Sequence, residues 1–143
     1  MNKRLKLKCC NYSLLAFVLP VLATGIILEC TGNDAGIFGI SFKRIVVIHI
    51  VLAAAMMALA AYHLYLHVGS KGWWQKVKKL KSHVTRLLVR IAILTAASGL
   101  ISLAVWLFNP VHTTVGGIHG KIGYLFIIIA VGHTIKRWKW FSR

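Results

Sequence analysis

Four long apolar segments constrain the fold of this chain more than any other feature. They run at about Tyr12–Cys30, Ile45–His67, Leu87–Phe108 and Gly117–Ile135, and each reaches or approaches the ~20 residues that cross a bilayer as a helix. Lipid offers no water to backbone groups, so each segment must satisfy its own amides as an α-helix. A closed barrel is excluded because the segments are continuously apolar and do not alternate. The sequence therefore predicts an all-α integral membrane protein.

The basic residues fall mostly on one side of these segments. The sequence has eighteen Lys and Arg against two acids, Glu29 and Asp34. Only Lys43, Arg44 and Lys121 belong to the side that also carries both acids. This asymmetry is the positive-inside pattern, and it predicts that both termini lie in the cytoplasm. Because phosphate binding would not demand such a bias, we expect membrane lipid as a partner and no nucleic acid.

The connections between the segments are short. They span residues 31–43, 68–86 and 109–116, and glycines and a proline mark the outer two, "TGNDAGIFG" and "NPVHTTVGG". Short links between consecutive helices predict one domain, residues 1–143, folded as an up-down-up-down four-helix bundle. In this topology the second and fourth segments run parallel. Trp73, Trp74, Trp138 and Trp140 are then expected at the inner interface.

Histidines bracket the second and fourth segments at the same interval. His49 and His63 are fourteen residues apart, and so are His119 and His133. Fourteen residues rise about 21 Å, and in a left-handed bundle with roughly 3.5 residues per turn both members of a pair face the same neighbour. His49 is therefore expected level with His119 near the outer surface, and His63 level with His133 near the inner one.

Two facing imidazoles at each of two depths are what two stacked haems require, because each iron takes one axial nitrogen from each side of its macrocycle. A neutral imidazole also brings no charge into lipid. We therefore predict two b-type haems with His49 and His119, and His63 and His133, as iron ligands. A lone intramembrane histidine bonded across a helix interface is the alternative for each position. A zinc site is disfavoured because no carboxylate or thiolate lies at the same depth.

Other residues are candidates for the haem environment. His67 lies one turn beyond His63 and is the other candidate for the inner iron, or for a propionate, quinone or proton contact. Gly25 and Gly99 fall at the depth of the outer pair, where they would leave room for haem or serve helix packing. Arg90, one turn inside the third segment, would pair with an inner propionate or extend to lipid phosphates. His83 is expected in a connection.

The stretch "HIVLAAAMMALAAYHLYLH" followed by "WW", then "SGLISL" and "GGIHGKIGYLFIIIAVGH", resembles the small di-haem transmembrane cytochromes b, and most closely the bacterial flavinylation-associated cytochrome family. The resemblance implies transmembrane electron transfer between membrane quinol and a redox partner outside, often an extracytoplasmic flavin-bearing protein. It implies a bacterial inner-membrane location and carries over His49, His63, His119 and His133 as ligands. No motif for covalent flavin attachment is present, so a flavin would belong to the partner.

An electron-transfer subunit is thus the expected role. Two other classes stay open: a self-contained quinone-dependent oxidoreductase that acts on a small oxidant, and a haem-free transporter that uses its histidines for protons or metal ions. The transporter lacks the intramembrane carboxylates that such carriers usually need.

Overall fold

The computed structural model describes residues 2–31, 39–69, 71–80, 82–111 and 113–137. These residues form four long helices, α1 (Lys3–Thr31), α2 (Phe42–Val68), α4 (His83–Phe108) and α5 (Thr114–Lys136), and one short helix, α3 (Trp73–Lys78). The protein is an all-α four-helix bundle, as the sequence predicts. All four long helices are long and apolar enough to cross a membrane.

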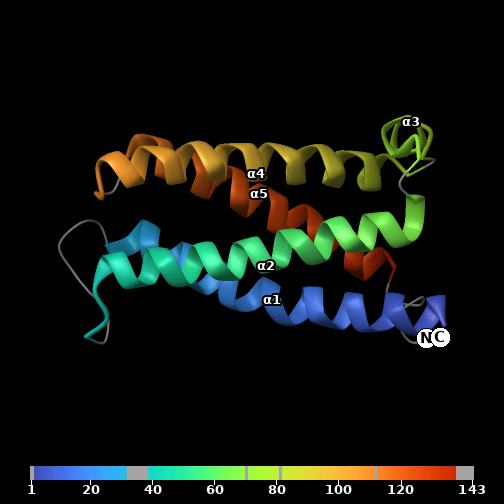
Figure 1. The fold of residues 1–143 in the computed structure, drawn as a ribbon, viewed down its shortest axis with the longest axis horizontal. Helices are drawn as coiled ribbons and strands as arrows, with labels where there is room; N and C mark the ends of the chain where they lie inside the picture. Colours follow the sequence, from blue (N-terminus) through green and yellow to red (C-terminus); the bar gives the residue numbers. More distant parts are fainter. Residues whose placement is uncertain (1, 32–38, 70, 81, 112, 138–143) are drawn as a thin grey trace.

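Successive long helices run in opposite directions, so that α2 and α5 are parallel (Figure 1). Helix α1 packs closely along α2, and α4 packs closely along α5, while the two resulting hairpins meet more sparsely, mainly through α1 and α5. Helix α1 begins at the same end of the bundle at which α5 ends. The described parts of the two termini therefore lie at one end, which we call the inner end.

Local sequence explains where several helices begin and end. Ser82 and Thr113 are the N-caps of α4 and α5, and their side chains accept hydrogen bonds from the backbone N–H groups of Thr85 and Gly116. Gly69 ends α2 with a positive φ of 77°, and its N–H donates to the Tyr65 carbonyl at 2.8 Å.

Two local expectations are wrong. The inner connection contains the short helix α3, which the sequence analysis does not predict. Hydropathy does not detect so short an amphipathic helix. His83 is the first residue of α4 rather than part of a connection, because the Ser82 cap starts that helix a turn before the apolar run. Trp73 and Trp74 lie on α3, whereas Trp138 and Trp140 are outside the described residues.

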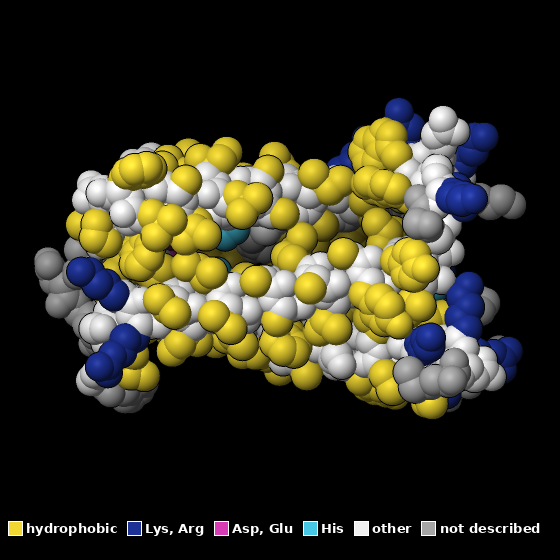
Figure 2. All heavy atoms as spheres, viewed as in Figure 1, with side chains coloured by type: hydrophobic (Ala, Val, Ile, Leu, Met, Phe, Trp, Pro, Cys, Tyr) yellow, Lys and Arg dark blue, Asp and Glu magenta, His cyan; other side chains and the backbone are white. Residues whose placement is uncertain are grey.

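The surface is apolar along the length of the bundle. Figure 2 shows hydrophobic side chains over the middle of the visible face and Lys and Arg side chains at its two ends, with more of them at the inner end. Leu19, Leu100 and Ile128 are each about 70% exposed, at 70, 68 and 69%. Such a surface has lipid as its natural solvent, and a multi-pass membrane protein is the consequence.

The buried core is small and central. It consists of Val21, Met56 and Phe126, contributed by α1, α2 and α5. Met56 and Phe126 are each seven residues from both histidines of their own helix. The core therefore lies halfway between the two histidine levels and separates the outer end of the bundle from the inner end.

Candidate functional site

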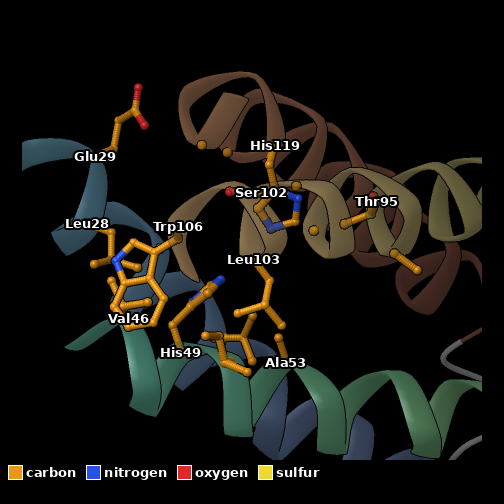
Figure 3. A pocket seen from close by; sticks show the side chains of 18 of the residues that line it. Leu28, Glu29, Val46, His49, Ala53, Thr95, Ser102, Leu103, Trp106 and His119 are labelled. Atoms are coloured by element: carbon orange, nitrogen blue, oxygen red, sulfur yellow. The ribbon is translucent and has the colours of Figure 1, made fainter. Parts of the chain in front are cut away.

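The outer histidine pair lies between the two hairpins. His49 projects from α2 and His119 from α5 into the same space (Figure 3). Their ring centroids are 6.4 Å apart and their planes are inclined by 73°. The two imidazoles are thus at one depth, as the spacing and the parallel helices predict.

The orientation of the His49 ring is set by α1. The Thr24 hydroxyl donates to the Pro20 carbonyl at 2.8 Å, within its own helix, and lies 2.9 Å from His49 Nδ1. A hydroxyl has one proton, so with that proton given to its own helix the oxygen accepts from Nδ1–H. The same hydroxyl also lies 3.0 Å from the Val21 carbonyl, again within its own helix. The contact between Thr24 and Nδ1 favours the His49 tautomer that leaves the lone pair on Nε2.

Residues of α4 orient the His119 ring in the same way. The Ser98 hydroxyl donates to the Thr95 carbonyl at 3.0 Å and lies 3.0 Å from His119 Nδ1. Each imidazole thus meets a hydroxyl whose proton is given to a carbonyl of its own helix. Two neutral rings with equivalent Nε2 lone pairs result.

Glycines follow both hydroxyl residues and touch the same rings. A Cβ on Gly25 would lie 3.5 Å from His49 Cε1, an ordinary contact, whereas a Cβ on Gly99 would lie 3.0 Å from His119 Cε1. The absence of a side chain at Gly99 is therefore what allows α4 to approach His119 so closely. Both glycines predicted at the outer depth lie directly against the histidines.

A cavity of about 410 Å³ surrounds the outer pair. This volume is within the range of about 300–1,000 Å³ that is usual for small-molecule and cofactor sites. All four long helices line the cavity, with Met56 and Phe126 among its apolar residues and Glu29 among its few polar ones. Figure 2 shows histidine in a hollow between the hairpins. The site is an apolar slot with two imidazoles inside it.

The inner histidines are arranged differently. His63 lies against His67 in a tilted arrangement, with ring centroids 4.6 Å apart and planes inclined by 54°. His133 Nδ1 lies 3.5 Å from the Thr85 hydroxyl of α4, and His133 is within electrostatic range of both His63 and His67. The assignment of His63 rather than His67 as the partner of His133 therefore stays a prediction.

Thr24 and Ser98 are site residues that the sequence analysis does not name. Their hydroxyls contact the outer histidines. Asn11 Oδ1 on α1 and His63 Nδ1 on α2 are both buried and have no hydrogen-bond partner in the described structure. Each of the two hydroxyl residues directly precedes a glycine, and that repeated pair was the signal in the sequence.

Arg90 is exposed on α4 and lines a hollow with His83, Arg86 and Leu87. Thr85 marks the face of α4 that meets His133. Five residues turn a helix by about 140° beyond a full turn, so Arg90 lies on nearly the opposite face. The structure thus does not bring Arg90 to the inner histidines.

The fold and the site together define a four-helix membrane protein with paired, hydrogen-bonded imidazoles between two hairpins. Among the described residues, no group of three or more His, Cys, Asp or Glu side chains could hold a metal ion. Comparisons with protein-family models, with curated proteins and with solved structures found no match.

Proposed function

We propose that this chain binds two b-type haems between α2 and α5 and carries electrons across a membrane. His49 and His119 would hold the outer haem, and His63 and His133 the inner one. The observation that carries the proposal is the outer pair: two imidazoles from different helices face each other in an apolar cavity, and each has Nδ1 engaged by a neighbouring helix.

The separation of the outer rings supports the proposal. An imidazole nitrogen binds a transition metal at about 2.0–2.1 Å, and the ring centroid lies roughly 1 Å further, so two imidazoles across one ion have centroids roughly 6 Å apart. The separation of 6.4 Å between the outer rings agrees with that requirement. A pair of ligands is enough for a haem iron, whose other four bonds come from the macrocycle.

The hydrogen bonds to Nδ1 support the same assignment. Histidines that bind metals almost always donate their other ring N–H to a nearby acceptor, which fixes the tautomer and raises the basicity of the ligand nitrogen. Thr24 and Ser98 supply such acceptors at 2.9 and 3.0 Å. A histidine that only bridged two helices would not need the same arrangement twice.

The central core gives the two levels separate environments. Met56 and Phe126 are 4 and 7% exposed and lie midway between the histidine levels, so apolar side chains occupy the space between these levels. Haem, when bound, supplies the one-electron redox chemistry, and the protein fixes spacing and dryness. The two levels are about 21 Å apart along the helices.

The partners follow from the resemblance to the di-haem cytochromes b. Membrane quinol is the proposed partner within the bilayer, and a flavin-bearing or other redox protein is the proposed partner outside, in a bacterial inner membrane. The described residues form membrane helices and short connections, so the role proposed is that of a relay or subunit.

The test is a reduced-minus-oxidised spectrum of the purified chain together with a pyridine haemochrome assay. We expect two b haems per chain. His49→Ala and His119→Ala should each remove one haem, and the same one, whereas Tyr65→Ala, an exposed residue of the same α2, should retain both. A colourless preparation would contradict the proposal and favour the haem-free transporter. Loss of the inner haem in His67→Ala but not in His63→Ala would reassign the inner ligand.

A further inference from the structure

Helix α3 and the inner end of α4 carry several Lys and Arg residues. The whole sequence has two acids, Glu29 and Asp34. Glu29 is near the outer end of α1, and Asp34 precedes α2 in the sequence. Among the described residues of α3 and α4, no carboxylate side chain is present to neutralise these cations.

Three of the basic side chains share one face of α4. His83, Arg86 and Arg90 fall within roughly 60° of one another around the helix. They line a hollow of about 410 Å³, and the apolar side chains of Val84 and Leu87 complete its walls. The hollow thus combines a cluster of nitrogen donors with an apolar surface in a single small space.

Hydrogen bonds already hold one side of this cluster in place. Arg86 Nη2 donates to His83 Nδ1 at 2.7 Å, and Arg86 Nη1 donates to the Lys78 carbonyl at the end of α3 at 3.4 Å. Arg90 is exposed, and no hydrogen bond or ion pair with the rest of the described chain engages it. Arg86 is therefore preorganised, while the Arg90 guanidinium keeps its donors for a ligand.

Helix α3 indicates the depth of this hollow in the membrane. Trp73 and Trp74 are 40 and 41% exposed and lie edge to face, and Lys78 Nζ lies 5.5 Å from the Trp74 ring centroid. Tryptophan beside lysine is typical of the headgroup level. Because Arg86 bonds to the Lys78 carbonyl, the cluster lies next to that level, with Leu87 towards the hydrocarbon.

We propose that His83, Arg86 and Arg90 form a binding site for the phosphate of an anionic phospholipid. Guanidinium groups bind phosphate oxygens through paired, charge-assisted hydrogen bonds, and Leu87, 46% exposed, would pack against the acyl chain. The site lies on the face of α4 opposite Thr85, the residue that meets His133, so it does not depend on the haem proposal.

The experiment counts phospholipids retained by the full chain in native mass spectrometry after exchange into mixtures of phosphatidylglycerol and phosphatidylcholine. We expect Arg86→Gln/Arg90→Gln to retain phosphatidylglycerol about tenfold less well than the unmodified chain. The control is Lys71→Gln/Lys79→Gln, which removes equal charge from exposed residues of the same inner connection and should reduce retention clearly less than the double arginine variant, because lysine lacks the paired donors of a guanidinium. Arg90→Lys, which keeps the charge without the paired donors, should fall between the two.

Three outcomes would overturn the site. If the two double variants lost equal amounts of phosphatidylglycerol, the lipid would be attracted by the basic surface as a whole and not by a specific site. Displacement of the lipid by inorganic phosphate at equal concentration would mean a site for free phosphate. If Arg86→Gln/Arg90→Gln left lipid retention unchanged but altered the haem absorbance, Arg90 would be assigned to a haem propionate instead of a lipid phosphate. Circular dichroism of each variant controls for folding.

Discussion

At the scale of single residues, the outer site depends on a repeated pair of small side chains. Thr24 with Gly25 on α1, and Ser98 with Gly99 on α4, each combine a hydroxyl for Nδ1 with a missing side chain beside the ring. The hydroxyl fixes how the ring is turned. Gly99 lets α4 come close enough for that contact, whereas a Cβ on Gly25 would only reach ordinary contact distance.

Thr24→Val tests the hydroxyl. Valine keeps the shape of threonine but removes the acceptor for His49 Nδ1–H, so the imidazole becomes a weaker donor. We expect roughly 10–100-fold weaker binding of the outer haem and a higher midpoint potential for it, measured by haem titration and by redox titration of the spectrum. Thr24→Ser restores the oxygen and should restore both values. If valine and serine gave the same potential, the hydroxyl would have no role in the site.

Gly99→Ala tests the close approach. The new methyl would lie 3.0 Å from His119 Cε1, and the ring must turn or shift to admit it. Alanine favours a helix over glycine by about 1 kcal/mol, so the fold should survive while occupancy of the outer site drops. The control is Gly132→Ala on α5, where a Cβ also meets nothing within 4 Å and which does not line the cavity around the outer pair. Identical haem spectra for the two variants would contradict this account.

The sequence predicts the histidines of the outer site and the two glycines beside them, but not the hydroxyl residues that contact their rings. A fixed interval on two parallel helices is enough to bring His49 and His119 to one level. The partners Thr24 and Ser98 depend on how α1 and α4 are rotated about their axes, and hydropathy carries little information on rotation. Arg90 shows the same limit, since its depth is readable from the sequence but its face is not.

At the scale of elements, the apolar segments predict the ends of the helices better than their starts. All four predicted C-terminal ends agree with the structure to within one residue, but α1 begins at Lys3 and not near Tyr12. Lysine, leucine and arginine are good helix formers, so the basic residues that precede the apolar segment are also part of the helix. Hydropathy detects only the part of a helix that enters lipid.

Phe126→Ala tests the central core. Phe126 is 7% exposed and packs with Val21 and Met56, whereas its neighbour Leu125 is 47% exposed towards lipid. Losing a buried phenyl ring costs about 3–5 kcal/mol in water-soluble cores, and we expect roughly 1–3 kcal/mol here because lipid, unlike water, also solvates apolar groups. Leu125→Ala should cost well under half as much. Thermal unfolding in detergent, followed by circular dichroism, measures both, and equal losses would mean that the core is not the site of packing.

At the scale of the whole molecule, two hairpins face each other across the histidine levels. Tight packing within each hairpin and sparse packing between them leave the apolar slot that contains His49 and His119. The sequence predicts four helices in alternating directions from its short connections. It does not predict that the bundle opens between the hairpins, because that depends on packing between residues far apart in the chain.

The orientation of this bundle in the membrane can be tested with the native cysteines. Cys9 and Cys30 are free and exposed near opposite ends of α1, and Cys10 is buried. Because the basic end is expected to face the cytoplasm, a membrane-impermeant maleimide added to intact cells with a permeable outer envelope should label Cys30. Cys9 should react only after the membrane is opened. Cys30→Ser should abolish labelling of intact cells, and Cys9→Ser should leave it unchanged. Labelling of Cys9 from outside would invert the topology and place the His49–His119 site on the cytoplasmic side.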